Sequence, residues 1–150
     1  MNRYIKLSLC ITFPLLIGGI SGYATATSIN DWYVGINKPS FNPPNYLFGP
    51  VWTILYILMG ISFYRILQSP QNTQQKNAII IFCIQLFLNF CWSFLFFNFQ
   101  LLGISFIEII MMWISILTMI YTFSKIDKTA DYLQIPYLLW VSFESVLNGS

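Results

Sequence analysis

Five stretches of predominantly apolar residues, each about as long as a membrane-spanning helix, dominate this sequence of 150 residues. They cover residues 7–26, 48–67, 78–97, 101–123 and 132–150. A bilayer core of ~30 Å requires about 20 apolar residues of helix, and no stretch shows the alternation that is typical of a barrel strand. The sequence therefore predicts an all-α integral membrane bundle of five transmembrane helices, which forms one domain over residues 1–150.

Composition excludes several other classes of protein. Charged residues make up 8% of the chain and hydrophobic residues 57%, whereas soluble domains carry about 25% charged residues. The net charge of +2 is too small and too scattered for a nucleic-acid partner. The chain has no histidine, and Cys10, Cys83 and Cys91 lack metal-ligand spacing. We therefore expect no metal site, no catalytic residue and no obligatory cofactor.

Basic residues are distributed unevenly between the two sides of such a bundle. One side would carry Arg3, Lys6, Arg65, Lys76, Lys125 and Lys128, and the other side only Lys38. The positive-inside rule then predicts a cytoplasmic N-terminus, in a bacterial inner membrane or, alternatively, an organelle membrane. The first stretch also resembles a signal peptide, but its length and its Gly18-x-x-x-Gly22 motif, which suits close helix packing, favour a retained helix.

Polar side chains inside apolar spans are costly to bury and are therefore informative. Gln85, Asn89 and Ser93 recur every four residues and share one helix face, while Tyr137 and Glu144 share another. At ~1.5 Å per residue, the side chains that reach the half of the bilayer opposite the basic residues are Trp52, Asn89, Trp92, Glu108, Trp140 and Glu144. This convergence predicts a pocket between helices.

Simpler explanations stay open for several of these residues. A polar stripe such as that of the third span can serve only to hold helices together. Trp32, Trp52 and Trp113 can belong to an interfacial belt, and Glu108 can reach interfacial water.

The long connection between the first two spans contains four of the seven prolines, between positions 39 and 50. Proline fixes φ, so this segment is stiff. Trp32 and Tyr33 begin it, and together with Pro43 and Pro44 they are expected to form a lid over the pocket. The alternative is a plain rigid connector.

Several motifs in this order resemble the TspO/MBR family of tryptophan-rich sensory proteins and translocator proteins (peripheral benzodiazepine receptors). They are Asp31-Trp32-Tyr33, Lys38-Pro39-Ser40-Phe41-x-Pro43-Pro44, Phe48-x-Pro50-Val51-Trp52-x-x-Leu55-Tyr56, Asn89-x-x-Trp92-Ser93 and Pro136-Tyr137-Leu138-Leu139-Trp140-x-x-Phe143. The resemblance implies five transmembrane helices, commonly as a homodimer, and a pocket that binds porphyrins, haem-like tetrapyrroles and hydrophobic drug-like molecules. It places Tyr33, Trp52, Tyr56, Asn89, Trp92, Ser93 and Trp140 in that pocket, to which the face of the fifth span adds Tyr137 and Glu144.

One departure from the family pattern concerns Glu144, because the family usually has a small residue at this position. A carboxylate there would narrow the pocket, repel propionates if ionised, or hydrogen-bond a pyrrole N–H if burial kept it neutral.

The most favoured function is a membrane receptor or transporter of tetrapyrroles, with a role in their transport or in stress regulation. The alternatives are a proton-coupled efflux protein that uses Glu108 or Glu144, a tryptophan-dependent porphyrin photo-degrader, and a purely structural partner protein.

Overall fold

The computed structural model describes residues 2–28, 48–93 and 102–149 of the chain. Within these ranges the structure contains five helices and no strand. The helices are α1 (Arg3–Ser28), α2 (Phe48–Leu67), α3 (Thr73–Ser93), α4 (Leu102–Ser124) and α5 (Lys128–Gly149). The prediction of an all-α protein is confirmed for the described residues. That the chain forms a single domain stays a prediction.

Local capping explains why two helices begin before the predicted apolar spans. Asn72 precedes α3, and its Oδ1 accepts a hydrogen bond of 3.0 Å from the backbone N–H of Gln75. Asp127 does the same for α5, since its Oδ1 accepts hydrogen bonds from the backbone N–H groups of Thr129 and Ala130 at 2.9 and 3.2 Å. Asparagine and aspartate are favoured caps because they satisfy amides that have no partner in the first turn.

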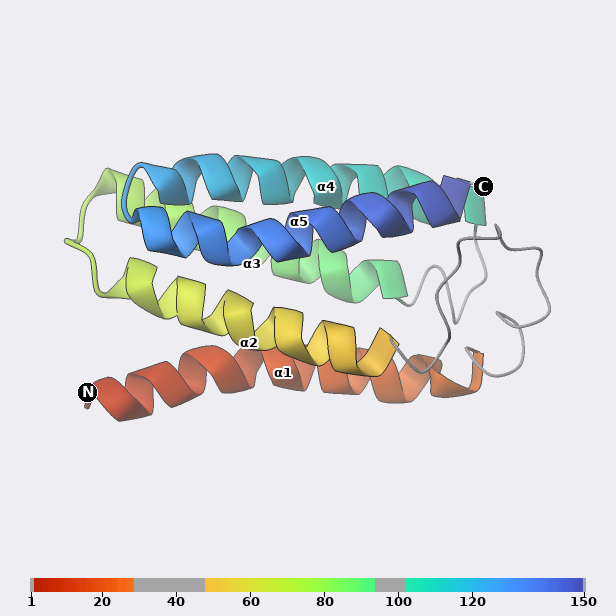
Figure 1. Cartoon of the computed structure of the whole chain (residues 1–150), viewed down its shortest axis with the longest axis horizontal. Coiled ribbons are helices and arrows are strands. Elements are labelled where there is room, and N and C mark those ends of the chain that lie inside the picture. The colour runs from red at the N-terminus through yellow and green to blue at the C-terminus, as the bar shows by residue number, and fades with distance from the viewer. Residues whose placement is uncertain (1, 29–47, 94–101, 150) are drawn as a thin grey trace.

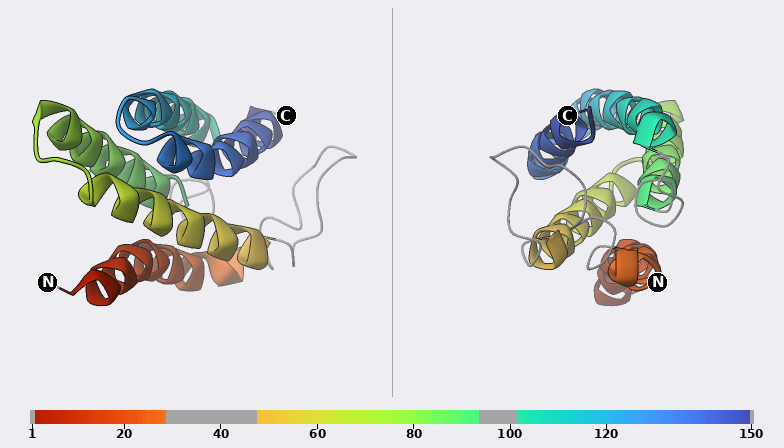
Figure 2. Two further views of the ribbon diagram at one scale, coloured as in Figure 1. Left: turned by 60° about the vertical axis from the view of Figure 1, so that its left-hand side comes forward. Right: turned by 90° about the vertical axis from the view of Figure 1, so that its right-hand side faces the viewer.

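The helices run along the long axis of the molecule (Figure 1), and the chain visits them out of spatial order. α1 packs mainly on α2, α2 packs also on α5, and α4 lies between α5 and α3. The end-on view in Figure 2 shows this arc of helices. The α2–α3 and α4–α5 turns lie at the end of the molecule that also holds the N-terminus (Figure 1).

The predicted grouping of basic residues is found at this end. Arg65, at the end of α2, pairs with Asp127 in the α4–α5 turn at 3.1 Å. The Lys6 ammonium, near the start of α1, donates a hydrogen bond of 3.1 Å to Gln68 after α2. Three chain segments are therefore joined by charged and polar contacts where the bundle would meet water.

Close helix contact in the first half of the chain depends on glycine. At Gly60 of α2, an added Cβ would lie 2.6 Å from the backbone of Cys10 and Ile11 in α1. At Gly18 of α1, an added Cβ would overlap the ring of Tyr56 in α2. Small residues let helix backbones approach closely in membranes, so Gly18 does serve close packing as predicted, and it does so within this chain.

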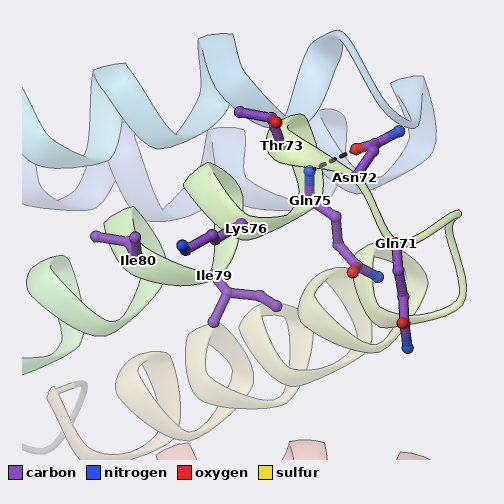
Figure 3. A pocket seen from close by; sticks show the side chains of 7 residues that line it. All are labelled: Gln71, Asn72, Thr73, Gln75, Lys76, Ile79 and Ile80. Atoms are coloured by element: carbon purple, nitrogen blue, oxygen red, sulfur yellow. Dashed lines mark hydrogen bonds between the residues drawn. The ribbon is translucent and has the colours of Figure 1, made fainter.

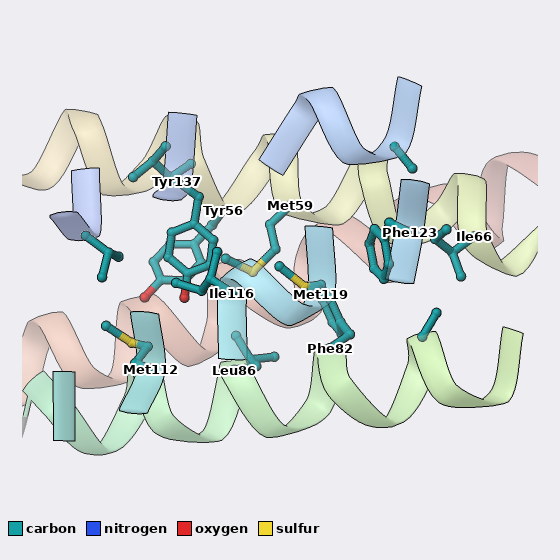
Figure 4. Packing of buried hydrophobic residues seen from close by; sticks show 14 of the residues in the cluster. Tyr56, Met59, Ile66, Phe82, Leu86, Met112, Ile116, Met119, Phe123 and Tyr137 are labelled. Atoms are coloured by element: carbon teal, nitrogen blue, oxygen red, sulfur yellow. The ribbon is translucent and has the colours of Figure 1, made fainter. Parts of the chain in front are cut away.

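The interior is filled by apolar side chains from α2 to α5 (Figure 4). Met59, Met112, Ile116 and Met119 have no exposed surface. Many large apolar side chains instead face outward, among them Leu9, Phe13, Phe87, Ile107 and Leu139. An outer surface of this kind is expected of helices that face lipid.

Four helices, α1 to α4, are long and apolar enough to cross a membrane. α5 is not among them, because Lys128, Asp131, Gln134 and Glu144 reduce its hydropathy. The structure buries the last three of these side chains against the bundle. The prediction from the sequence that α5 is a fifth membrane span stays a prediction.

Candidate functional site

A chain of buried hydrogen bonds joins α2, α3 and α5 in the half of the bundle away from the basic end. The Tyr56 hydroxyl donates to Asn89 Oδ1 at 2.7 Å, and Asn89 Nδ2 donates to the Tyr137 hydroxyl oxygen at 2.8 Å. The Tyr137 hydroxyl in turn donates to Gln85 Oε1 at 2.8 Å. All four side chains are at most 5% exposed, so this network is protected from water and lipid.

The spacing of α3 makes this network possible. Gln85 and Asn89 are one helical turn apart and point the same way. Each contacts both α2 and α5, since Gln85 also donates to the sulfur of Met59 in α2. The prediction that this stripe holds helices together is therefore confirmed for Gln85 and Asn89. Gln85 was not among the predicted site residues, although its spacing from Asn89 was the signal that could have included it.

Aromatic rings extend the site from this network toward the surface. The indole of Trp52 stacks on Tyr56 with a centroid distance of 5.5 Å, and it meets Tyr137 edge-on at 6.2 Å. Trp52 is half-buried, whereas the two tyrosines are fully inside (Figure 4). Trp52 therefore offers an accessible aromatic face above a buried polar layer.

Trp140 adds a second half-buried indole, from α5. Its ring lies 5.7 Å from that of Phe143, and both Trp140 and Trp52 interact with the carboxylate of Glu144. These contacts bring α2 and α5 residues to one place, as the depth argument predicted. Trp92 is buried at 4% exposure in the same core cluster.

Two carboxylates lie in this layer. Glu144 on α5 is 3% exposed and Glu108 on α4 is 8% exposed. Both act electrostatically on the hydroxyl of Tyr137, and neither carboxylate has a contact with full hydrogen-bond geometry. The carboxylate oxygens of Glu108 are buried within the bundle.

Trp113, which the sequence allowed to belong to an interfacial belt, forms a hydrogen bond between two helices. Its indole N–H donates a hydrogen bond of 2.7 Å to the hydroxyl of Ser142 and so ties α4 to α5. This contact makes Trp113 a useful reference for the tryptophans of the site.

Some predicted site residues lie outside the described residues. They are Tyr33, Trp32, Pro43 and Pro44 of the first connection and the side chain of Ser93. The lid and these two pocket positions therefore stay predictions.

A surface cavity of about 510 Å³ lies elsewhere, at the start of α3 (Figure 3). It is lined by Gln71, Asn72, Thr73, Gln75, Lys76, Ile79 and Ile80. Most of these side chains are exposed, and the cavity belongs to the basic end of the bundle. It shares no residue with the aromatic layer.

Comparison with known proteins gives consistent matches over the chain. The model of the TspO/MBR family matches residues 10–150. The chain is 39% identical to the tryptophan-rich protein TspO of Chlorobaculum tepidum over 150 residues, covering 99% of this chain and 95% of the relative. It is 42% identical to the TspO protein of Archaeoglobus fulgidus over 146 residues, covering 96% and 93%. The human translocator protein is 29% identical over 119 residues, covering 78% of this chain and 70% of the relative.

Proposed function

Since the chain belongs to the TspO/MBR family, we propose that this integral membrane protein is a receptor or transporter that binds tetrapyrroles, such as porphyrin or haem, and similar hydrophobic plates. Its relatives are named for tryptophan richness and for translocation, which supports a role in moving or sensing such a molecule. The binding site is the aromatic layer formed by Trp52, Tyr56, Tyr137 and Trp140.

The observation that carries the proposal is the position of Trp52. Its half-buried indole stands against two buried tyrosines, at 5.5 and 6.2 Å, and it shares the Glu144 carboxylate with Trp140. A tetrapyrrole is flat and largely apolar, so two indole faces and the surrounding buried surface would supply most of the binding free energy. Because the chain has no histidine, we propose that haem binds as a ligand by the same contacts as free-base porphyrin.

The test is an absorbance titration of the purified protein with protoporphyrin and with haem. We expect the Trp52→Phe/Trp140→Phe double variant to bind several-fold more weakly, since each indole contributes stacking of about 0.5–1.5 kcal/mol beyond its area and phenylalanine keeps only part of it. The matched control is Trp113→Phe, which removes an indole that binds Ser142 instead. Unchanged affinity in the double variant would refute the proposal.

We propose that the protein lies in a bacterial inner membrane, with the N-terminus and the α2–α3 turn in the cytoplasm. We also propose that it forms a homodimer in the lipid bilayer. The six basic residues of the described chain gather at that end, as the positive-inside rule requires. In a variant without the native cysteines, a single cysteine at the exposed Gln71 should react with a membrane-impermeant maleimide only after cells are opened. Reaction in intact cells would reverse the orientation.

A second candidate function, proton-coupled efflux, is favoured by the burial of Glu108 and Glu144. A carboxylate that is buried inside a membrane bundle away from positive charge is suited to gain and lose a proton. Drug resistance that depends on the proton gradient and disappears in Glu144→Gln would support this function. Light-dependent loss of the porphyrin Soret band, absent in the double tryptophan variant, would instead support degradation.

A further inference from the structure

The tyrosine hydroxyls nearest to Glu108 and Glu144 already donate to other groups. The Tyr56 hydroxyl donates to Asn89 and the Tyr137 hydroxyl donates to Gln85. A hydroxyl has one proton to donate, so neither tyrosine can also donate to a carboxylate. Both carboxylates act on Tyr137. The indole N–H groups of Trp52 and Trp140 approach Glu144, but neither carboxylate has a contact with full hydrogen-bond geometry.

Positive charge is also absent from this layer of the described chain. Its lysines and arginines lie at the other end of the bundle (Figure 1), and the ion pairs there join Arg65 to Asp127 and Lys128 to Asp131. The Glu108 carboxylate instead has the Cys91 thiol within electrostatic range. Among the described residues, Glu108 has no donor with hydrogen-bond geometry, and Glu144 has only the two neutral indole N–H groups. Buried carboxylates in such surroundings are stabilised by a proton or by a further donor from a ligand.

We propose that Glu108 and Glu144 make the aromatic site selective for flat ligands whose inner edge is neutral or cationic, and that they reject an anionic edge. This inference rests on the proposed function and narrows its ligand class. A cationic or N–H-bearing edge would supply the missing donor. A ligand carboxylate would instead place a further negative charge in a layer that holds two carboxylates and no cation among its described residues, where charges are weakly screened. The acidic side chains of a tetrapyrrole would therefore have to be masked or face away from this layer.

The experiment uses three probes with the same macrocycle: protoporphyrin IX, its dimethyl ester, and its bis-amide with ethylenediamine, which carries two ammonium groups. Each is titrated into the purified full-length protein in one detergent at one pH. In the native protein we expect the ester and the ammonium derivative to bind at least about tenfold more tightly than the diacid, after correction for partition into empty micelles.

Two isosteric variants, Glu144→Gln and Glu108→Gln, then locate the cause. Each replaces a carboxyl group that can ionise with a neutral amide of the same size, so we expect the preference for ester over diacid to fall several-fold in each. Micelle partition is the same for all variants and cancels from the comparison. The control is Asp131→Asn, which changes another buried acid of α5 that pairs with Lys128 and should leave the preference unchanged.

The outcomes separate this inference from the proposed function. The proposed selectivity would be overturned if all three probes bound with equal affinity. It would also be overturned if both glutamine variants kept the full preference for the ester. Either result would leave porphyrin binding intact. If none of the three probes binds the native protein, the proposed function falls and the selectivity falls with it.

Discussion

Asn89 is the residue on which the buried layer depends most, because it is both the acceptor for Tyr56 and the donor to Tyr137. An amide in the middle of an apolar helix is unfavourable by itself. It becomes stabilising when each of its partners would otherwise be buried without a hydrogen bond. The residue therefore fixes the relative positions of α2, α3 and α5.

Replacement of this amide tests that role. We expect Asn89→Leu to lower the free energy of unfolding by about 1–3 kcal/mol, because the Tyr56 hydroxyl loses its acceptor and the Tyr137 oxygen loses its donor. Thermal unfolding in detergent measures the loss. The control is Ser115→Ala, which removes a buried hydroxyl that bonds only within its own helix, to the carbonyl of Met112. An equal loss in both variants would contradict the role assigned to Asn89.

The α1–α2 pair shows how glycine lets two helices approach closely. Gly60 faces the backbone of Cys10 and Ile11, and Gly18 faces the ring of Tyr56. Tyr56 also belongs to the hydrogen-bond network. The position of α1 therefore influences where the Tyr56 ring lies in the site. The packing of one helix pair thus supports a ring that stacks on Trp52.

Adding one methyl group at this contact should separate the two helices. We expect Gly60→Ala to destabilise the bundle by about 1–3 kcal/mol, because an added Cβ meets backbone atoms at 2.6 Å that cannot move independently. Gly19→Ala is the matched control, since nothing lies within 4 Å of its added Cβ and alanine favours helix by up to about 1 kcal/mol. Thermal unfolding that ranks the two variants in the opposite order would reject this packing.

At the scale of the whole molecule, the two ends of the bundle differ in chemistry. One end holds basic residues and the Arg65–Asp127 pair, and the other half holds the aromatic layer with its two carboxylates. Partial burial raises the pKa of Asp127, but hydrogen bonds from Arg65, Ala130 and Thr129 outweigh that effect and hold the pKa below its usual value. The pair therefore links α2 to the α4–α5 turn in a pH-dependent way.

The direction of this pH dependence follows from the lowered pKa. An aspartate that is more acidic in the folded protein stabilises it above the unfolded pKa of about 3.9, and this stability is lost as the pH falls through the folded pKa. We expect Arg65→Gln to cost less than about 1 kcal/mol near neutral pH, because both side chains are partly exposed. The difference from the native protein should begin to shrink below about pH 4 and vanish once the pH is below the lowered pKa of Asp127, as measured by thermal unfolding across pH.

Lys125→Gln is the control for this experiment. It removes a positive charge from the same turn, where the Lys125 ammonium lies 4.6 Å from the centre of the Tyr121 ring, without breaking the Arg65–Asp127 pair. A destabilisation by Arg65→Gln that persists to the lowest pH would show that the pair does not cause it.

Much of this architecture could be predicted because membranes impose strong rules on sequence. The apolar stretches indicated the helices, and the uneven basic residues indicated which turns share an end. The meeting of Trp52, Tyr56, Asn89, Tyr137, Trp140 and Glu144 followed from depth and from the family motifs. The fifth helix was harder to assess as a span, because its buried Asp131, Gln134 and Glu144 make it look polar when neighbouring helices are ignored.

The sequence by itself determined the helices and their order, since each needs only a continuous apolar segment whose backbone hydrogen bonds are satisfied internally. Only the tertiary structure decided that α5 lies between α2 and α4, and that Tyr137 joins Asn89 to Gln85. Such contacts depend on how helices distant in the chain pack side by side. No local pattern could show that the tyrosine hydroxyls would donate to Asn89 and Gln85 and not to the buried carboxylates of Glu108 and Glu144.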